Sequence, residues 1–83
     1  MKARVSIRLK SAILDPQGKT VQQALQQMGY SDVSSVRIGK LVELEVGGND
    51  PIEVRTKVEE FSRKLLTNPL METFEIELVR DVV

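Results

Sequence analysis

The sequence predicts an α+β domain of two layers, in which a four-stranded antiparallel sheet carries two helices on one face. Three observations predict it: segments of alternating polarity, two segments with apolar residues at helical spacing, and the order βαββαβ in which they follow one another. The 83 residues make a single domain, taken as 1–83. Because a chain of this length buries a small core, association with another chain would add stability.

The first strand is predicted over residues 2–10, where apolar and polar side chains alternate. A helix should follow, because Asp15 supplies an N-cap oxygen and Pro16 suits the first helical position. Its apolar stripe is Val21, Ala24, Leu25 and Met28. Gly29 is expected to end this helix in a left-handed conformation.

Two strands of a hairpin are predicted on either side of Gly39, over residues 33–38 and 41–46. An odd-length loop or a bulge is predicted at this turn, because it keeps the apolar side chains of both strands on one face, whereas a two-residue loop mixes core with solvent. Leu41 is then left pointing outward beside Lys40.

The second helix is predicted to begin at Asp50, which caps it, and at Pro51. Its buried stripe is predicted to be Val54, Val58, Phe61 and Leu65. Asn68 and Pro69 end the helix, and an alternating segment with Phe74, Ile76 and Leu78 forms the last strand.

The charged faces of the strands predict their order in the sheet. The polar face of the first strand is basic, and those of the third and last strands are acidic: Arg4, Arg8 and Lys10 against Glu43, Glu45, Glu75 and Glu77. Opposite charges favour neighbouring strands by about 0.2–1 kcal/mol per pair. The first strand is therefore expected between the third and the fourth, which is the ferredoxin-like order.

Composition excludes several classes of function. The 12 basic and 12 acidic side chains balance, so the bulk charge gives no sign of nucleic-acid binding. Cysteine and histidine are absent, which removes thiolate metal sites, disulfides and the commonest general base. The sequence contains no apolar run of about 18 residues, so no membrane span is predicted. The expected location is the cytoplasm. The carboxylates form no convincing acid–base pair, so no catalytic residue, cofactor or metal site is predicted.

The turn after the first strand contains the candidate residues Asp15, Gln17 and Gly18. Capping explains Asp15, but Gly18 costs about 1 kcal/mol in a helix relative to alanine. A glycine there permits close approach of another backbone or a ligand. The turn is therefore either a helix cap alone or also a contact site.

The hairpin tip contains the candidate residues Arg37, Gly39, Lys40 and Leu41. It is either a solvated turn or a basic docking tip with one exposed apolar side chain. Asn68, Pro69 and Glu72 are interpreted as a helix stop and strand start.

Taken together, the motifs resemble those of the PurS family along nearly the whole chain. PurS is a subunit of phosphoribosylformylglycinamidine synthase. The motifs are LDPQG at 14–18, AL at 24–25 with GY at 29–30, VRIGK at 36–40, and LLTNP at 65–69 followed by Glu72. The resemblance implies a non-catalytic homodimer that bridges a PurL synthetase subunit and a PurQ glutaminase subunit and supports ammonia transfer. It also implies that ATP and Mg²⁺ bind the synthetase subunit rather than this chain.

The partner-facing residues proposed from exposure and chemistry are Arg37, Gly39, Lys40 and Leu41, followed by Asp15, Gln17 and Gly18. The alternative is a free-standing regulatory domain of ACT type, which shares the βαββαβ order. Such a domain would bind an amino acid near the first strand-to-helix turn.

Overall fold

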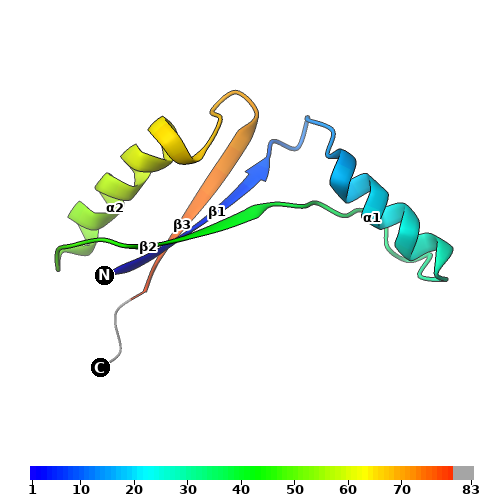
Figure 1. Ribbon diagram of the computed structural model, residues 1–83, viewed down its shortest axis with the longest axis horizontal. Coiled ribbons are helices and arrows are strands. Elements are labelled where there is room, and N and C mark those ends of the chain that lie inside the picture. Colours follow the sequence, from blue (N-terminus) through cyan, green and yellow to red (C-terminus); the bar gives the residue numbers. More distant parts are fainter. Residues whose placement is uncertain (80–83) are drawn as a thin grey trace.

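The computed structural model describes residues 1–79, which form a three-stranded antiparallel sheet and two helices that diverge from each other (Figure 1). In chain order the elements are β1 (Lys2–Leu9), α1 (Pro16–Gln27), β2 (Lys40–Glu45), α2 (Pro51–Phe61), the π-helical turn η1 (Ser62–Leu66) and β3 (Glu72–Val79). The strand order is β2-β1-β3. The prediction of an α+β chain is correct, whereas the prediction of a four-stranded sheet is wrong.

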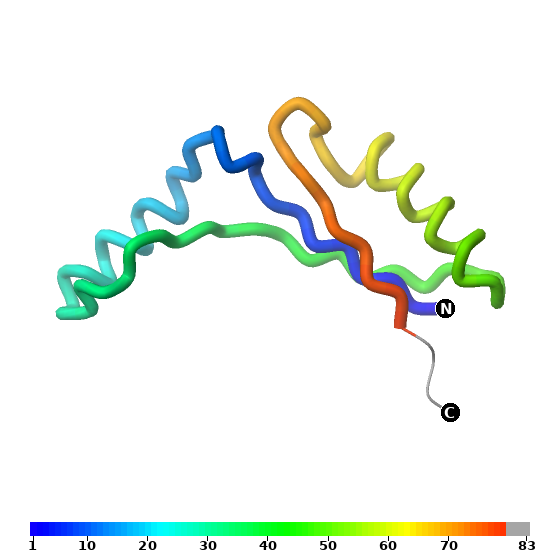
Figure 2. The backbone as a smooth tube through the Cα atoms, turned by 180° about the vertical axis from the view of Figure 1, so that it is seen from behind, coloured from blue at the N-terminus to red at the C-terminus, as the bar shows by residue number. Residues whose placement is uncertain are grey.

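The predicted hairpin is absent because residues 33–39 run on in line with β2 instead of turning back (Figures 1 and 2). β2 pairs with β1, so that Val42 lies opposite Val5. Gly39 has no positive φ angle, and an added Cβ there would lie 2.6 Å from the Ile7 carbonyl oxygen. This glycine is therefore needed for close approach to β1 rather than for a turn.

The central position of β1, predicted from charge, is confirmed. Ion pairs join it to both neighbours: Lys2 to Glu43 at 3.2 Å, Arg4 to Glu77 at 3.9 Å, and Arg8 to Glu75 at 3.4 Å. All of these side chains are at least one-third exposed, so the pairs contribute little free energy. These ion pairs instead favour one strand order, because only a central β1 places its basic side chains beside acidic side chains of both neighbouring strands.

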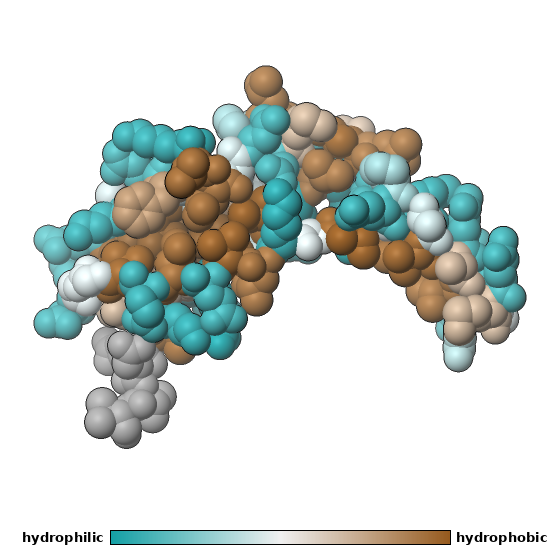
Figure 3. All heavy atoms as spheres, viewed as in Figure 1, coloured by the Kyte–Doolittle hydropathy of each residue, from teal (hydrophilic) through white to brown (hydrophobic). Residues whose placement is uncertain are grey.

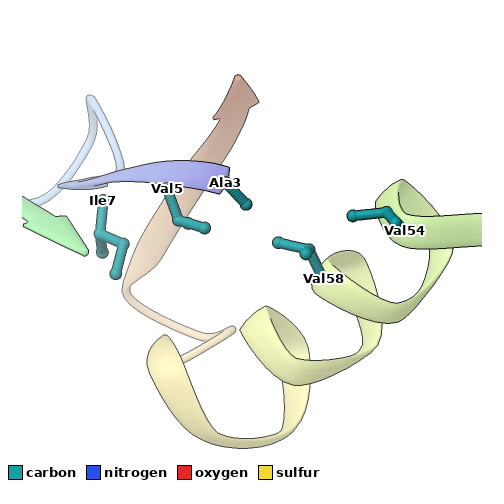
Figure 4. Packing of buried hydrophobic residues seen from close by; sticks show 5 residues of the cluster. All are labelled: Ala3, Val5, Ile7, Val54 and Val58. Atoms are coloured by element: carbon teal, nitrogen blue, oxygen red, sulfur yellow. The ribbon is translucent and has the colours of Figure 1, made fainter. Parts of the chain in front are cut away.

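The hydrophobic core lies between the sheet and α2 alone. Val54 and Val58 of α2 face Ala3, Val5 and Ile7 of β1, and all five side chains are at most 1% exposed (Figure 4). Half-buried residues from β2, β3 and η1 surround this cluster. The small core agrees with the prediction from chain length.

The π-helical turn η1 corrects the predicted stripe of the second helix. Its hydrogen bond runs from the Thr67 amide to the Ser62 carbonyl, which inserts one residue into the helical repeat. Leu65 is consequently 82% exposed and Leu66 packs against the core instead. Ser62 is buried, and its hydroxyl donates to the Val58 carbonyl at 2.8 Å. Phe61, predicted buried, is 42% exposed.

α1 and the segment after it form an arm that projects from the sheet; we call residues 11–38 the α1 arm. The radius of gyration is 16.3 Å, against about 12 Å for a compact chain of this length. The apolar stripe of α1 is largely uncovered, since Val21 is 39% and Met28 69% exposed. The prediction that both helices cover one face of the sheet is therefore wrong within the chain. Among the described residues, no helix has the length and apolar character needed to cross a membrane.

Candidate functional site at the junction of the α1 arm and the sheet

The three turn motifs singled out in the sequence meet where the α1 arm joins the sheet. A pocket of about 310 Å³ lies there between β1, the start of α1 and residues 38–40. It is lined by Asp15, Pro16 and Gln17 from the first motif, by Ile38, Gly39 and Lys40 from the second, and by Glu72 from the third. The fold thus brings together segments that the sequence placed at separate turns.

Asp15 uses both carboxylate oxygens at this junction. Oδ1 accepts from the Gly18 amide at 3.0 Å as the N-cap, and Oδ2 accepts from the Ile38 amide at 2.7 Å. These two hydrogen bonds, with a smaller contribution from the positive charge of Arg37, lower the pKa of Asp15 below its ordinary value. The carboxylate is therefore ionised at neutral pH and joins α1 to the return segment, residues 33–38.

Gly18 allows the return segment to pass directly over α1. It is buried, and an added Cβ would lie 2.2 Å from the Val36 carbonyl oxygen. Of the two interpretations offered by the sequence, the close approach of another backbone accounts for this glycine. Gln17 is exposed beside it.

Gln22 and Gln26 also bind the return segment. Their side-chain amides donate to the Ser34 carbonyl at 2.7 Å and the Val33 carbonyl at 3.2 Å. The sequence reasoning missed both residues. The available signal was the spacing of Asp15, Gln22 and Gln26, because residues seven and four apart share one face of a helix.

Arg37 connects the arm to the end of β1. Its Nη2 donates to the Leu9 carbonyl at 2.6 Å and to the Lys10 carbonyl at 3.0 Å. The Lys10 amide in turn donates to the Met71 carbonyl at 2.8 Å, which ties this strand end to the chain before β3. Arg37 thus has a structural role in the chain, and its predicted contact with a partner protein stays a prediction.

Lys40 and Leu41 lie at the start of β2, on opposite sides of the strand. Lys40 is 3.8 Å from Glu72, whose other oxygen accepts from the Asn68 amide at 2.8 Å. Leu41 lies opposite Ser6 on the charged face of the sheet and is 58% exposed, so it points outward as predicted. As an apolar side chain among charges, it remains a candidate contact for a partner.

Within residues 1–79, no group of acidic side chains is placed to hold a metal ion. The two junction carboxylates, Asp15 and Glu72, accept backbone hydrogen bonds. The hydrogen bonds at this junction orient the α1 arm, whose apolar side chains are largely exposed.

Comparison with known proteins identifies the family. The family model described as "PurS: Phosphoribosylformylglycinamidine (FGAM) synthase" matches residues 2–80. The chain belongs to the PurS family. It is 43% identical to the PurS subunit of Bacillus subtilis, covering 99% of this chain and 95% of that one. It is 38% identical to the PurS subunit of Methanocaldococcus jannaschii, covering 93% of each chain.

Solved PurS structures have the same fold. The TM-score is 0.80 with PurS of B. subtilis at 42% identity, covering 92% of this chain and 94% of that one. It is 0.83 with a chain of PurLQS from Thermotoga maritima at 28% identity, covering 92% and 93%. Because the α1 arm is about one-third of the chain, matches of this coverage and score include the projecting arm.

Family membership fixes the function at the level of the complex. As a PurS chain, the protein is a small subunit of phosphoribosylformylglycinamidine synthase in purine biosynthesis. This confirms the implied role as a small subunit of that synthase and decides against the alternative of an ACT-type regulatory domain.

Proposed function

We propose that this PurS chain forms a homodimer through its α1 arm, and that the dimer bridges a PurL-like synthetase subunit and a PurQ-like glutaminase subunit. The observation that carries the bridging role is the match to a chain of PurLQS from T. maritima over nearly the full length of both chains. The homodimer rests on the open shape of the chain itself.

The apolar surface of the arm supports association with a second copy. Figure 3 shows apolar atoms gathered over α2 and the sheet, and again along the arm. No residue of the arm is among the described residues that form the core or pack against it. The side chains of Val42 and Leu44 on β2 are only partly buried, on the face that α2 packs against. The arm of a second copy has the complementary apolar stripe to cover that face, which would remove both surfaces from water.

The return segment supports the same arrangement. Among the described residues, positions 34–39 make no backbone–backbone hydrogen bond with another segment. On one side, Gln22 of α1 donates to the Ser34 carbonyl, and the N-cap residue Asp15 accepts from the Ile38 amide. The other side is an unpaired extended edge in line with β2, and pairing it with a second copy would satisfy its backbone groups.

The bridging role is one of positioning. Holding the glutaminase and synthetase sites in fixed relation keeps ammonia from being lost to solvent and raises its local concentration, without a nucleophile or base from this chain. ATP and Mg²⁺ then belong to the synthetase subunit, and this chain binds no cofactor. The complex operates in the cytoplasm.

Reconstitution tests this proposal. The chain is mixed with the synthetase and glutaminase subunits of the same organism, and glutamine-dependent amidine formation is measured with and without it. We expect amidine formation only when all three are present, and a dimer in sedimentation at micromolar concentration. Full activity without this chain would refute the bridging role, and a monomer would refute the homodimer.

A further inference from the structure

The direction of the α1 arm is set without any contribution from the hydrophobic core. The buried cluster and the half-buried residues packed on it come from β1, β2, α2, η1, β3 and their flanking residues, and among the described residues none lies between 9 and 41. The arm joins the sheet through two chain connections, one after β1 and one at Gly39. Something other than core packing must hold it in one orientation.

Two polar side chains make the connections that do so. Arg37 binds the carbonyls of Leu9 and Lys10 at the end of β1, and thereby links the return segment to the sheet. Asp15 binds the Ile38 amide, and thereby links the start of α1 to the same segment. We call these contacts the Asp15–Arg37 clamp. Both side chains carry a charge, and hydrogen bonds to charged groups are roughly twice as strong as neutral ones.

We propose that Asp15 and Arg37 are positioning residues, and that the clamp holds the α1 arm in the direction in which a second copy can receive it. This inference rests on the proposed homodimer. The clamp opposes a competing arrangement in which the arm folds back on its own sheet. A turn at Gly39 would carry residue 37 to the far edge of β2, away from β1, and would break both Arg37 hydrogen bonds.

The two N-caps of the chain provide a matched pair of variants. Asp15→Asn keeps a side-chain oxygen for the helix cap, since asparagine caps as well as aspartate does. Asparagine replaces the other oxygen with an NH2 group, which cannot accept a hydrogen bond. The side chain can then accept from the Gly18 amide or from the Ile38 amide but not from both, so either the cap or the clamp is lost. Asp50→Asn makes the same change in α2, where the carboxylate accepts from the Ile52 amide in its own helix turn. Arg37→Lys is the conservative variant of the second clamp residue.

The absence of cysteine allows the direction of the arm to be measured directly. Spin labels are placed on Ser31→Cys near the arm tip and Lys57→Cys on α2, both at exposed positions. The labelled chain is diluted into an excess of unlabelled chain, so that pulsed electron paramagnetic resonance reports the distance within one copy. Sedimentation measures dimerisation, and circular dichroism checks that each variant is folded.

We expect one narrow distance distribution for the parent and for Asp50→Asn, and a broadened or shifted one for Asp15→Asn and Arg37→Lys. The dimer dissociation constant of the clamp variants should rise about tenfold or more, the scale of one lost hydrogen bond to a charged group. Their activity in the complex should recover when their concentration is raised, because a higher concentration restores the dimer.

Unchanged distances and unchanged dimerisation in folded clamp variants would overturn the proposal. A monomeric parent would refute the homodimer instead, and the label distances would still show whether the clamp sets the arm. If Arg37→Lys fails to fold, Asp15→Asn alone decides, because the oxygen that asparagine retains can still cap the helix.

Discussion

Gly18→Ala is expected to detach the return segment from α1 while leaving the core intact. The added Cβ would lie 2.2 Å from the Val36 carbonyl oxygen and 2.8 Å from Asp15 Oδ2. Real Cβ atoms essentially never approach closer than 3.0 Å, so the backbone at Val36 must move outward by at least about 0.8 Å. Such a movement also lengthens the neighbouring bond from the Ile38 amide to Asp15.

Two opposing effects decide the magnitude. Alanine favours a helix over glycine by about 1 kcal/mol, and overpacking typically costs about 1–3 kcal/mol. The cost should be at the upper end because the contacted atom belongs to the backbone and has no alternative rotamer. The net effect is a destabilisation of the arm by roughly 1–2 kcal/mol. Since no arm residue belongs to the described core, global unfolding of the sheet and α2 should change little.

Amide hydrogen exchange distinguishes a local loss of stability in the arm from a loss of global stability. Protection of the Ile38 amide should fall about 5- to 30-fold in Gly18→Ala, as expected for that loss of local stability. Amides in β1 should be unchanged. Gly47→Ala is the control, because its Cβ would meet nothing within 4 Å and its φ is not positive. A Gly18→Ala protein with full Ile38 protection and undiminished dimerisation would refute the role assigned to this glycine.

Three further predictions concern the core, the clamp and the exposed face of the sheet. Val58→Ala should lower the free energy of unfolding, measured in urea, by about 2–3 kcal/mol. Leu65→Ala should stay within about 0.5 kcal/mol of the parent because the π-helical turn exposes this side chain. Equal losses in the two variants would contradict the exposed position of Leu65. The pKa of Asp15 is lowered in the folded chain, so its stabilising contribution is present above the ordinary pKa of 3.8 and is lost as pH falls through the lower folded-state pKa. Over that acidic range, protection of the Ile38 amide from hydrogen exchange should decline in the parent but not in Asp15→Asn. An equal acid response in both proteins would exclude this carboxylate as the cause. Leu41→Ser should leave unfolding unchanged yet weaken binding to the synthetase or glutaminase subunit in a pull-down, with Lys57→Ser as the control; unchanged binding would exclude Leu41 as a partner contact.

Local features of the chain were predictable because they depend on neighbouring residues. Asp15 and Asp50 cap the two helices as predicted, and Gly29 takes a positive φ of 101° at the end of the first. The alternating charges of β1 correctly placed it between an acidic strand on each side. In the same way, the family was evident from short turn motifs, since each of those motifs is contiguous in the chain.

The site itself was only partly predictable. Gly18 and Arg37 were singled out from the sequence, but their partners, the Val36 carbonyl and the Leu9 and Lys10 carbonyls, are backbone atoms that no side-chain pattern identifies. The exposure of Leu65 also escaped prediction, because a single π-helical turn shifts the 3.6-residue repeat without a sequence signal of its own.

The sequence by itself determined both helices, three of the four predicted strands, and the family to which the chain belongs. Only the tertiary structure decided whether the apolar stripe of α1 covers its own sheet or projects from it. Alternation of polarity specifies that residues 33–46 suit an extended backbone, but it is the same for a hairpin and for a straight continuation. The choice is made by backbone contacts at Gly39 and by the Asp15–Arg37 clamp, which join residues far apart in the chain.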